Sequence, residues 1–470
     1  MKKYLLVFIL FATGLNGFGQ KVRLSGRLLN LGPQTFELSA HTGYFKDSLV
    51  VNADGTFNYE TDQIKSPFQG ILTNRKNISF VLFIAPGYDM QINADAKDPR
   101  TLSLTTNFSG IGAKANAYWG ARRKLLIADT VNWNAKDADT YIHHLLEEHK
   151  MLSGLIEKHF NSSNTEPYSD HFKRSLLTDL KYDSLNELFD SYASENNLNW
   201  QQIKAMVSRI GITSLEKELN EESNLAGLSF SFLVTGYPDY CYSYNAFPAD
   251  EEIKKKGNYQ LYLTSKFYTG KVYDFVMYKN MPSTIAGTFK LEDFEKMRSY
   301  VDRVGDSRIK ALLKSLISTR IKEASELKPG TLSPLFNLPD TSGKMHELAE
   351  FRGKVVYLDL WASWCGPCKE ETPHLKKIYD HYKGNNKVEI ISIATSDAKN
   401  RTKRYDIISK DQMTWLQLED TDDSFAKSYQ VRTIPRFIII DKQGRIVDSN
   451  APRPSDPAKL MAILEKEIQK

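Results

Sequence analysis

Two of the three cysteines in this 470-residue chain lie three positions apart, in the stretch WASWCGPCKEETP. Cys365 follows the apolar run KVVYLDLWA, which predicts a strand buried on both faces, and it opens a predicted helix. The unpaired N–H groups and the positive end of the helix dipole there favour the thiolate form of cysteine. The thiolate is the nucleophile of thiol–disulfide exchange. The spacing therefore predicts that Cys365 attacks a partner disulfide and that Cys368, one turn later and more shielded, resolves the mixed disulfide.

The C-x-x-C spacing also occurs in zinc sites and in structural disulfides. A closed zinc site needs four ligands, usually a second C-x-x-C or a histidine pair. The third cysteine, Cys241, lies among predicted helices, and His374 and His381 lie on the same predicted helix as the pair. Two cysteines this close cannot staple distant elements. A working redox pair without a metal is therefore the favoured interpretation.

The first residues have the layout of a secretory signal peptide. Lys2 and Lys3 precede an apolar run at 4–12, and small residues follow before Gln20. The apolar run is much shorter than the roughly 20 residues that a membrane span needs. We expect cleavage after Gly19, no lipid anchor because no cysteine is near, and no stable membrane insertion. The mature chain is then expected to be soluble, on the periplasmic or extracellular side.

Composition narrows the class of protein. Removal of the first 19 residues takes away two lysines and no acid, so the formal net charge falls from +5 to +3. This small charge is spread along the chain, which gives no basic footprint for nucleic acid. An apolar content of 41% leaves ample material for a core, so an exported chain of this length does not depend on disulfide staples.

Three regions follow the signal peptide. Residues 20–110 show short alternating runs broken by turns, which predict an antiparallel β-sandwich. The clearest examples are SLVVNADGTFNYE, with a turn at Asp54-Gly55, and FVLFIAPGYDMQINA, with a turn at Pro86-Gly87. Residues 111–327 read mostly as helix, with apolar stripes that predict core packing. The sequence ELKPGTLSP then marks a boundary, and residues 328–470 alternate strand and helix as an α/β domain with a mixed central sheet.

At this point the sequence resembles a known family. VVYLDLWASWCGPC and TIPRFIIID resemble segments of thioredoxin-fold thiol–disulfide oxidoreductases. The preceding PGTLSPLFNLPDTSGKMHELAEFRGK is similar to the extracytoplasmic branch that includes TlpA, ResA and cytochrome c maturation reductases, with an AhpC/TSA-like core shared with peroxiredoxins. The resemblance covers residues 328–470 and implies a thioredoxin-like fold there. The earlier regions resemble N-terminal extensions of some exported members, a likeness that implies no activity.

The resemblance assigns roles around the pair. It implies that Cys365 is the nucleophile, that Cys368 is the resolving thiol and that the two form a redox-active disulfide. Pro435 matches a cis proline that faces the pair in this family, where the adjoining backbone binds an extended substrate. The remaining residues expected at the client-binding surface are Trp364, Gly366, Pro367 and Ile434.

Two acids are candidate catalytic groups. Asp359, six residues before Cys365, matches the buried aspartate that thioredoxins place beneath the resolving thiol. A buried carboxylate with a raised pKa accepts the proton of Cys368 as that thiol attacks. Glu371 matches the glutamate of the cytochrome-maturation branch, whereas an acid in the first turns of a helix also simply complements the helix dipole.

These features predict an exported thiol–disulfide oxidoreductase without a cofactor. The Gly-Pro between the cysteines resembles reducing thioredoxins more than strong oxidants, so reduction of protein disulfides is the first interpretation. The resemblance implies disulfide-containing client proteins and a membrane-embedded thiol electron donor as partners. A disulfide oxidase or isomerase remains open, as does a ligand-binding module with a vestigial thioredoxin domain. A peroxidase is disfavoured, because WASWCGPC lacks the Pro/Thr-containing motif of peroxidatic cysteines.

Two further features are set aside. The stretch YIHHLLEEHK holds His143, His144 and His149, but His144 and His149 are five positions apart, about 140° around a helix, and cannot share a ligand face. A solvated helix face is the simpler interpretation. Cys241, in YPDYCYSYNAFP, is expected to be a buried small apolar residue.

Overall fold

The computed structural model describes residues 20–43, 45–128, 137–161, 166–212, 214–254, 259–288, 290–395, 397 and 400–470. The predicted signal peptide, residues 1–19, lies outside these ranges. The chain divides into two compact units, Met1–Lys279 and Asn280–Lys470, and each is described by itself. Along the described ranges, no helix combines the length and the apolar character needed to cross a membrane.

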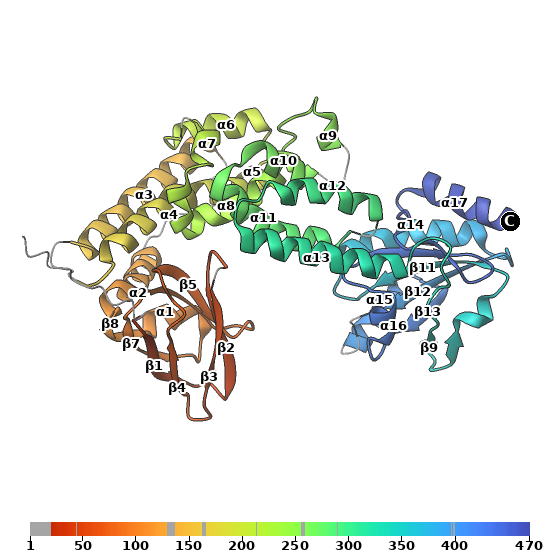
Figure 1. Cartoon of the computed structure of the whole chain (residues 1–470), viewed down its shortest axis with the longest axis horizontal. Coiled ribbons are helices and arrows are strands. Elements are labelled where there is room, and N and C mark those ends of the chain that lie inside the picture. The colour runs from red at the N-terminus through yellow and green to blue at the C-terminus, as the bar shows by residue number, and fades with distance from the viewer. Residues whose placement is uncertain are drawn as a thin grey trace, which may run out of the picture. The chain divides into compact units, whose positions relative to one another are not determined.

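Unit 1 begins with two four-stranded sheets, the red and orange arrows in Figure 1. Their strands are β1 (Val22–Leu29), β2 (Gln34–Ala40), β3 (Lys46–Val51), β4 (Thr56–Thr61), β5 (Phe68–Thr73), β6 (Ser79–Ile84), β7 (Asp89–Asp95) and β8 (Asn107–Ile111). One sheet has the order β4-β1-β7-β8 and the other β3-β2-β5-β6. All neighbours are antiparallel except β1 and β7, which are parallel. The inward residues of both sheets share one core, as the sequence predicted for a sandwich.

Both turns that the sequence indicated are present, but each joins strands of different sheets. At the first, Gly55 has φ +83° and its N–H donates to the carbonyl of Asn52. β3 before this turn pairs with β2, whereas β4 after it pairs with β1. The turn between β6 and β7 crosses between the sheets in the same way. The reason is burial, because both strands at each crossing bury one face in the same core.

The rest of unit 1 is helical. Its helices are α1 (Leu102–Thr105), α2 (Ala113–Ala128), α3 (Ala138–His159), α4 (Ser169–Glu187), α5 (Ala193–Glu195), α6 (Trp200–Arg209), α7 (Leu215–Glu218), α8 (Leu228–Ser243), α9 (Glu251–Lys254), α10 (Tyr259–Phe267) and α11 (Gly270–Ala286), with 3-10 turns at Pro99–Thr101 and Glu222–Ala226. The division between the units falls within α11. The predicted apolar stripes include one that begins at Phe172 on α4. It is buried, and beyond α4 it continues through a π-helical turn at Leu188–Tyr192. The sandwich core extends without a break into α2, α3 and α4.

Unit 2 has a five-stranded mixed sheet of order β13-β12-β11-β14-β15. Its elements are α12 (Leu291–Asp302), α13 (Ser307–Glu326), β9 (Asn337–Pro339), β10 (Met345–Glu347), a 3-10 turn (Leu348–Phe351), β11 (Val355–Trp361), α14 (Gly366–Tyr382), β12 (Val388–Ala394), α15 (Arg401–Lys410), β13 (Leu416–Glu419), α16 (Ser424–Ser428), β14 (Arg436–Ile440), β15 (Ile446–Asp448) and α17 (Pro457–Gln469). β11, β12 and β13 run parallel, whereas β14 is antiparallel to β11 and to β15. The α/β domain with a mixed sheet is therefore confirmed.

The central strand β11 is buried along its whole length, which explains its continuous apolar sequence. Successive side chains of a strand point to opposite faces, so β11 contributes to two cores. Val355, Tyr357 and Trp361 join the core that contains α14 and α17. Val356 and Leu358 join the opposite core, which contains residues of α16 and of the segment before β11. In Figure 1 α14 lies along the strands of this sheet.

Candidate active site

The two cysteines form a disulfide at the N-terminus of α14. Their Cα atoms are 5.3 Å apart, and Cys365 is the N-cap residue, whose sulfur accepts a hydrogen bond of 3.2 Å from the N–H of Cys368. Both cysteines are 4% exposed, whereas the side chain before them, Trp364, is 54% exposed. Gly366 and Pro367 are also exposed. A sulfur at this position is stabilised as a thiolate when the pair is reduced, because the helix dipole and the first N–H groups face it.

Asp359 lies on the same face of β11 as this disulfide. It is two residues from Tyr357 and from Trp361 along the strand, so it shares their face, and both of these pack in the core that contains the two cysteines. The carboxyl group is buried. Burial raises its pKa to about 7, the negative charge of Glu371 acts in the same direction, and a hydrogen bond from Ser392 opposes both. A carboxyl group with this pKa exchanges a proton readily at neutral pH.

A buried hydroxyl group holds the Asp359 carboxylate. Ser392 is opposite Asp359 in the parallel pair of β11 and β12, and its Oγ donates a hydrogen bond of 2.6 Å to Asp359 Oδ2. The same Oγ accepts a hydrogen bond of 2.8 Å from the indole Nε1 of Trp415. Sequence reasoning missed both residues. The available signal was a serine inside KVEIISIAT, where a buried polar side chain needs a partner.

Glu371 is buried on α14 and faces the segment before α17. Its carboxylate accepts two hydrogen bonds of 2.9 Å from Ser455, one from the backbone N–H and one from Oγ. The Arg453 guanidinium lies 3.6 Å from the same carboxylate. Glu371 therefore ties α14 to the segment that leads into α17, and it acts on Asp359 through its charge.

The segment before β14 completes the surroundings of the disulfide. The Ile434–Pro435 peptide bond is cis, and Pro435 immediately precedes β14. Ile434 is partly buried and packs against the core that contains Cys365 and Cys368. The structure thus places the cysteines and Asp359 on one side of the unit 2 sheet, whereas Ile434 contacts the cores on both sides.

The residues set aside in the sequence lie in unit 1. Cys241 is buried on α8, as predicted, and burial raises the pKa of its thiol to about 12. His143, His144 and His149 lie on α3, and among the described residues there is no group of three or more His, Cys, Asp and Glu residues placed to hold a metal.

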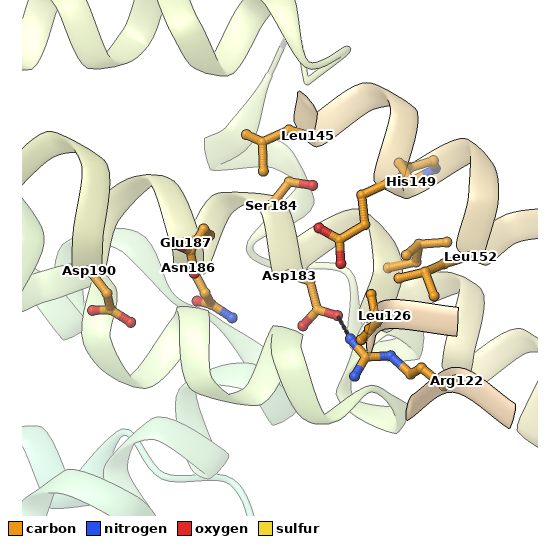
Figure 2. Close-up of a pocket in the computed structure, with 12 residues that line it drawn as sticks. Arg122, Leu126, Leu145, His149, Leu152, Asp183, Ser184, Asn186, Glu187 and Asp190 are labelled. Atoms are coloured by element: carbon orange, nitrogen blue, oxygen red, sulfur yellow. Dashed lines mark ion pairs between the residues drawn. The ribbon is translucent and has the colours of Figure 1, made fainter. Parts of the chain in front are cut away.

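A cavity of about 470 Å³ lies between α2, α3 and α4 in unit 1. Figure 2 shows Arg122 and Asp183 joined there by an ion pair of 3.6 Å, with His149 on the α3 side. Its remaining lining mixes leucines with carboxylates: Leu126, Leu145, Glu148, Leu152, Leu180, Ser184, Asn186, Glu187 and Asp190. The Cys365–Cys368 disulfide does not belong to this cavity and lies in unit 2.

Known proteins match the part of the chain that holds the disulfide. The Redoxin family model matches residues 328–464. Thiol-disulfide oxidoreductase ResA of Bacillus subtilis (strain 168) is 33% identical over 125 residues, which cover 26% of this chain and 66% of that protein. ResA of Geobacillus kaustophilus (strain HTA426) is 31% identical over 124 residues, which cover 26% of this chain and 70% of that protein.

The chain belongs to the ResA-like, thioredoxin-fold thiol–disulfide oxidoreductases. Among solved structures, the thioredoxin domain of a thiol-disulfide oxidoreductase from Bacteroides vulgatus is 28% identical. That match covers 30% of this chain and 99% of the other, with a TM-score of 0.27. The Redoxin match begins at residue 328, so the sandwich and helices α1–α13 of this oxidoreductase lie outside it.

Proposed function

We propose that this oxidoreductase is exported and reduces disulfides of client proteins through Cys365 and Cys368. The observation that carries the proposal is the Cys365–Cys368 disulfide at the start of α14, on the face of β11 that also holds the buried Asp359. The three groups supply a nucleophile, a resolving thiol and a proton acceptor. The presence of these groups on one face of the sheet favours exchange chemistry over a structural disulfide.

In the proposed cycle the disulfide is first reduced to two thiols by an external dithiol, which is itself oxidised. The Cys365 thiolate then attacks one sulfur of the client disulfide, and the other client sulfur leaves as a thiolate. Cys368 next attacks Cys365 Sγ, which breaks the mixed disulfide and releases the second client thiolate. Two electrons pass to the client, and the Cys365–Cys368 disulfide forms again.

Asp359 is proposed to take the proton of Cys368 during the second attack. Only its ionised form accepts a proton, and a pKa of about 7 leaves a large ionised fraction at neutral pH. Glu371 contributes through its charge, which keeps the pKa of Asp359 high. Trp364, Gly366 and Pro367 are proposed to meet the client on one side of the disulfide, and Ile434 and Pro435 on the other.

The partners and the location complete the proposal. The electron donor is a membrane-embedded dithiol protein, and the clients are exported proteins with disulfides. No nucleic acid and no stable membrane insertion take part. The N-terminal run of two lysines, nine apolar residues and small residues supports export. The proposed regions remain residues 20–110, 111–327 and 328–470.

The deciding experiment is the reduction potential of the Cys365–Cys368 pair, measured by equilibration in dithiol buffers. A value near the roughly −270 mV of thioredoxin supports a reductase. A value near about −120 mV means that the pair donates disulfides, and the cycle then runs in reverse. In the reductase case a Cys368→Ser variant accumulates mixed disulfides through Cys365.

A further inference from the structure

Helix α13 lies before the residues that the Redoxin model matches, but it is part of unit 2. Leu327, directly after the helix, packs in the same core as Leu358 and Ile438 of the central sheet. The last turns of α13 are therefore fixed to the sheet that carries the disulfide. The polar side chains of these turns point to the segment that precedes Ile434.

Four hydrogen bonds join α13 to this segment. Arg432 Nη2 donates to Glu323 Oε1 at 2.6 Å, and Arg320 Nη1 donates to Gln430 Oε1 at 3.2 Å. Gln430 Nε2 donates to the backbone carbonyl of Glu323 at 2.8 Å and to the carboxylate of Glu326 at 3.0 Å. Arg320 also donates to Glu323 Oε2 at 3.0 Å, so Glu323 bonds to both arginines. The hydrogen bonds from Arg432 and Arg320 outweigh burial and keep the pKa of Glu323 below its usual value.

The segment is also held from the side of β14. Arg436, which is 1% exposed, donates from Nη1 to the carbonyl oxygens of Tyr429 and Gln430 at 2.7 and 3.0 Å. Gln430 has φ +52°, a left-handed conformation that is uncommon outside glycine. Polar contacts from two directions therefore hold this backbone two residues before the exposed Arg432–Thr433 pair and the adjoining Ile434.

Close packing does not replace these contacts. A cavity of about 500 Å³ is lined by Glu323, Glu326, Gln430, Val431 and Arg432, together with residues of α16. Side chains beside such a space keep their geometry through hydrogen bonds rather than through steric confinement. Loss of one partner in this cluster therefore loosens the segment on its α13 side, and Ile434 is only two residues beyond Arg432.

We propose that Glu323 on α13 is a positioning residue of the reaction, which through Arg432 holds the backbone before Ile434 in the shape that a client segment binds. This inference rests on the proposed function, in which the client meets Ile434 and Pro435. It assigns a role to a helix outside the Redoxin match. A large client that contacts this backbone depends on Glu323, whereas a small disulfide that reaches only Cys365 does not.

The test compares two disulfides with the full chain. Reduction of the polypeptide disulfide is followed over many turnovers with dithiothreitol as the electron source. The small disulfide is mixed with the chain after the chain has been reduced and the dithiothreitol removed, because dithiothreitol reduces this probe directly. The probes are insulin, as a polypeptide disulfide, and 5,5′-dithiobis(2-nitrobenzoic acid), as a small one. For Glu323→Ala we expect KM for insulin to rise about fivefold, with kcat within about twofold of the wild-type value. The substitution weakens the binding of the client but leaves the exchange reaction at the cysteines unchanged. The rate with the small disulfide and the reduction potential stay at wild-type values.

Arg432→Gln removes the same ion pair from the exposed side, and it keeps the test valid if Glu323→Ala fails to fold. The double variant is expected to raise KM for insulin by the same factor as one single variant, not by the product of the two factors, because both substitutions remove the same contact. Lys322→Ala is the matched control, since Lys322 is an exposed neighbour on the same helix.

The outcomes separate the two proposals. Unchanged KM for insulin in both single variants overturns the inference, and so does an equal loss with both probes, which indicates general damage. If the wild-type chain reduces neither probe, the reductase proposal itself is wrong and this inference falls with it.

Discussion

At the residue scale, the buried carboxyl group of Asp359 has the most direct consequence for the chemistry. The variant Asp359→Asn keeps the size of the side chain but cannot accept a proton. We expect the decay of the mixed disulfide near pH 7 to slow by roughly 100-fold, the lower end of what a positioned general base contributes. Stopped-flow measurement of client release checks this value, and an unchanged rate removes Asp359 from the mechanism.

The same carboxyl group predicts a pH-dependent stability. Its pKa is about 7 in the folded chain and 3.8 in the reference state, so between these pH values the folded state holds a proton that the unfolded state lacks. The free energy of unfolding therefore falls as the pH rises from 4 to 7, by up to about 4 kcal/mol. Asp359→Asn should resist urea better than the wild type at pH 8. The free energies of unfolding of the two proteins, measured against pH, should converge near pH 4.

Ser392 and Glu371 are expected to shift the pKa of Asp359 in opposite directions. Ser392→Ala removes the hydrogen bond that lowers this pKa, so the midpoint of the pH–rate profile for resolution moves above 7. Glu371→Gln removes the charge that raises it, so the midpoint moves below 7, and the variant keeps oxygen and nitrogen atoms near Ser455. Two midpoints that move in the same direction would falsify this electrostatic arrangement.

At the scale of elements, the parallel pair of β1 and β7 depends on one glycine. Gly26 has φ +147°, and a Cβ there would overlap the carbonyl oxygen of Ile92, its partner in the register. Gly26→Ala should therefore destabilise unit 1 by about 2 kcal/mol or more, through backbone strain and a broken strand pair. Gly32→Ala is the control, because nothing lies within 4 Å of a Cβ there. Equal denaturation midpoints for the two variants contradict the prediction.

The strand turns show which features of the sandwich a local sequence pattern predicts and which it does not. Asp54-Gly55 and Pro86-Gly87 predicted turns at the correct places, because turn chemistry depends on the residues of the turn itself. The same pattern does not tell whether the next strand pairs with its neighbour or crosses to the other sheet. Leu49 and Phe57 are buried in one core in either arrangement, so their alternation is the same.

At the scale of the whole molecule, each unit contains its own core. The two cores around the central sheet draw on residues from Leu327 to Ile468, and the core of the sandwich draws on residues up to Leu180. A fragment of residues 280–470 is therefore expected to fold and to keep the reduction potential of the full chain within about 30 mV, or about 1.4 kcal/mol. Urea titration of the full chain should show two transitions, of which only one depends on the redox state. A fragment that remains unfolded contradicts this independence.

The sequence alone predicted the proposed chemistry of the cysteine pair, because every feature involved is local: the C-x-x-C spacing, the apolar run before it and the helix after it. It also indicated Asp359 and Pro435, since short motifs carry both. Only the tertiary structure decided which polar groups meet. Ser392 is 33 residues from Asp359, and Gln430 is 107 residues from Glu323. Contacts between residues so far apart in the sequence depend on strand register and helix packing, which arise from the burial of the whole core rather than from any short stretch.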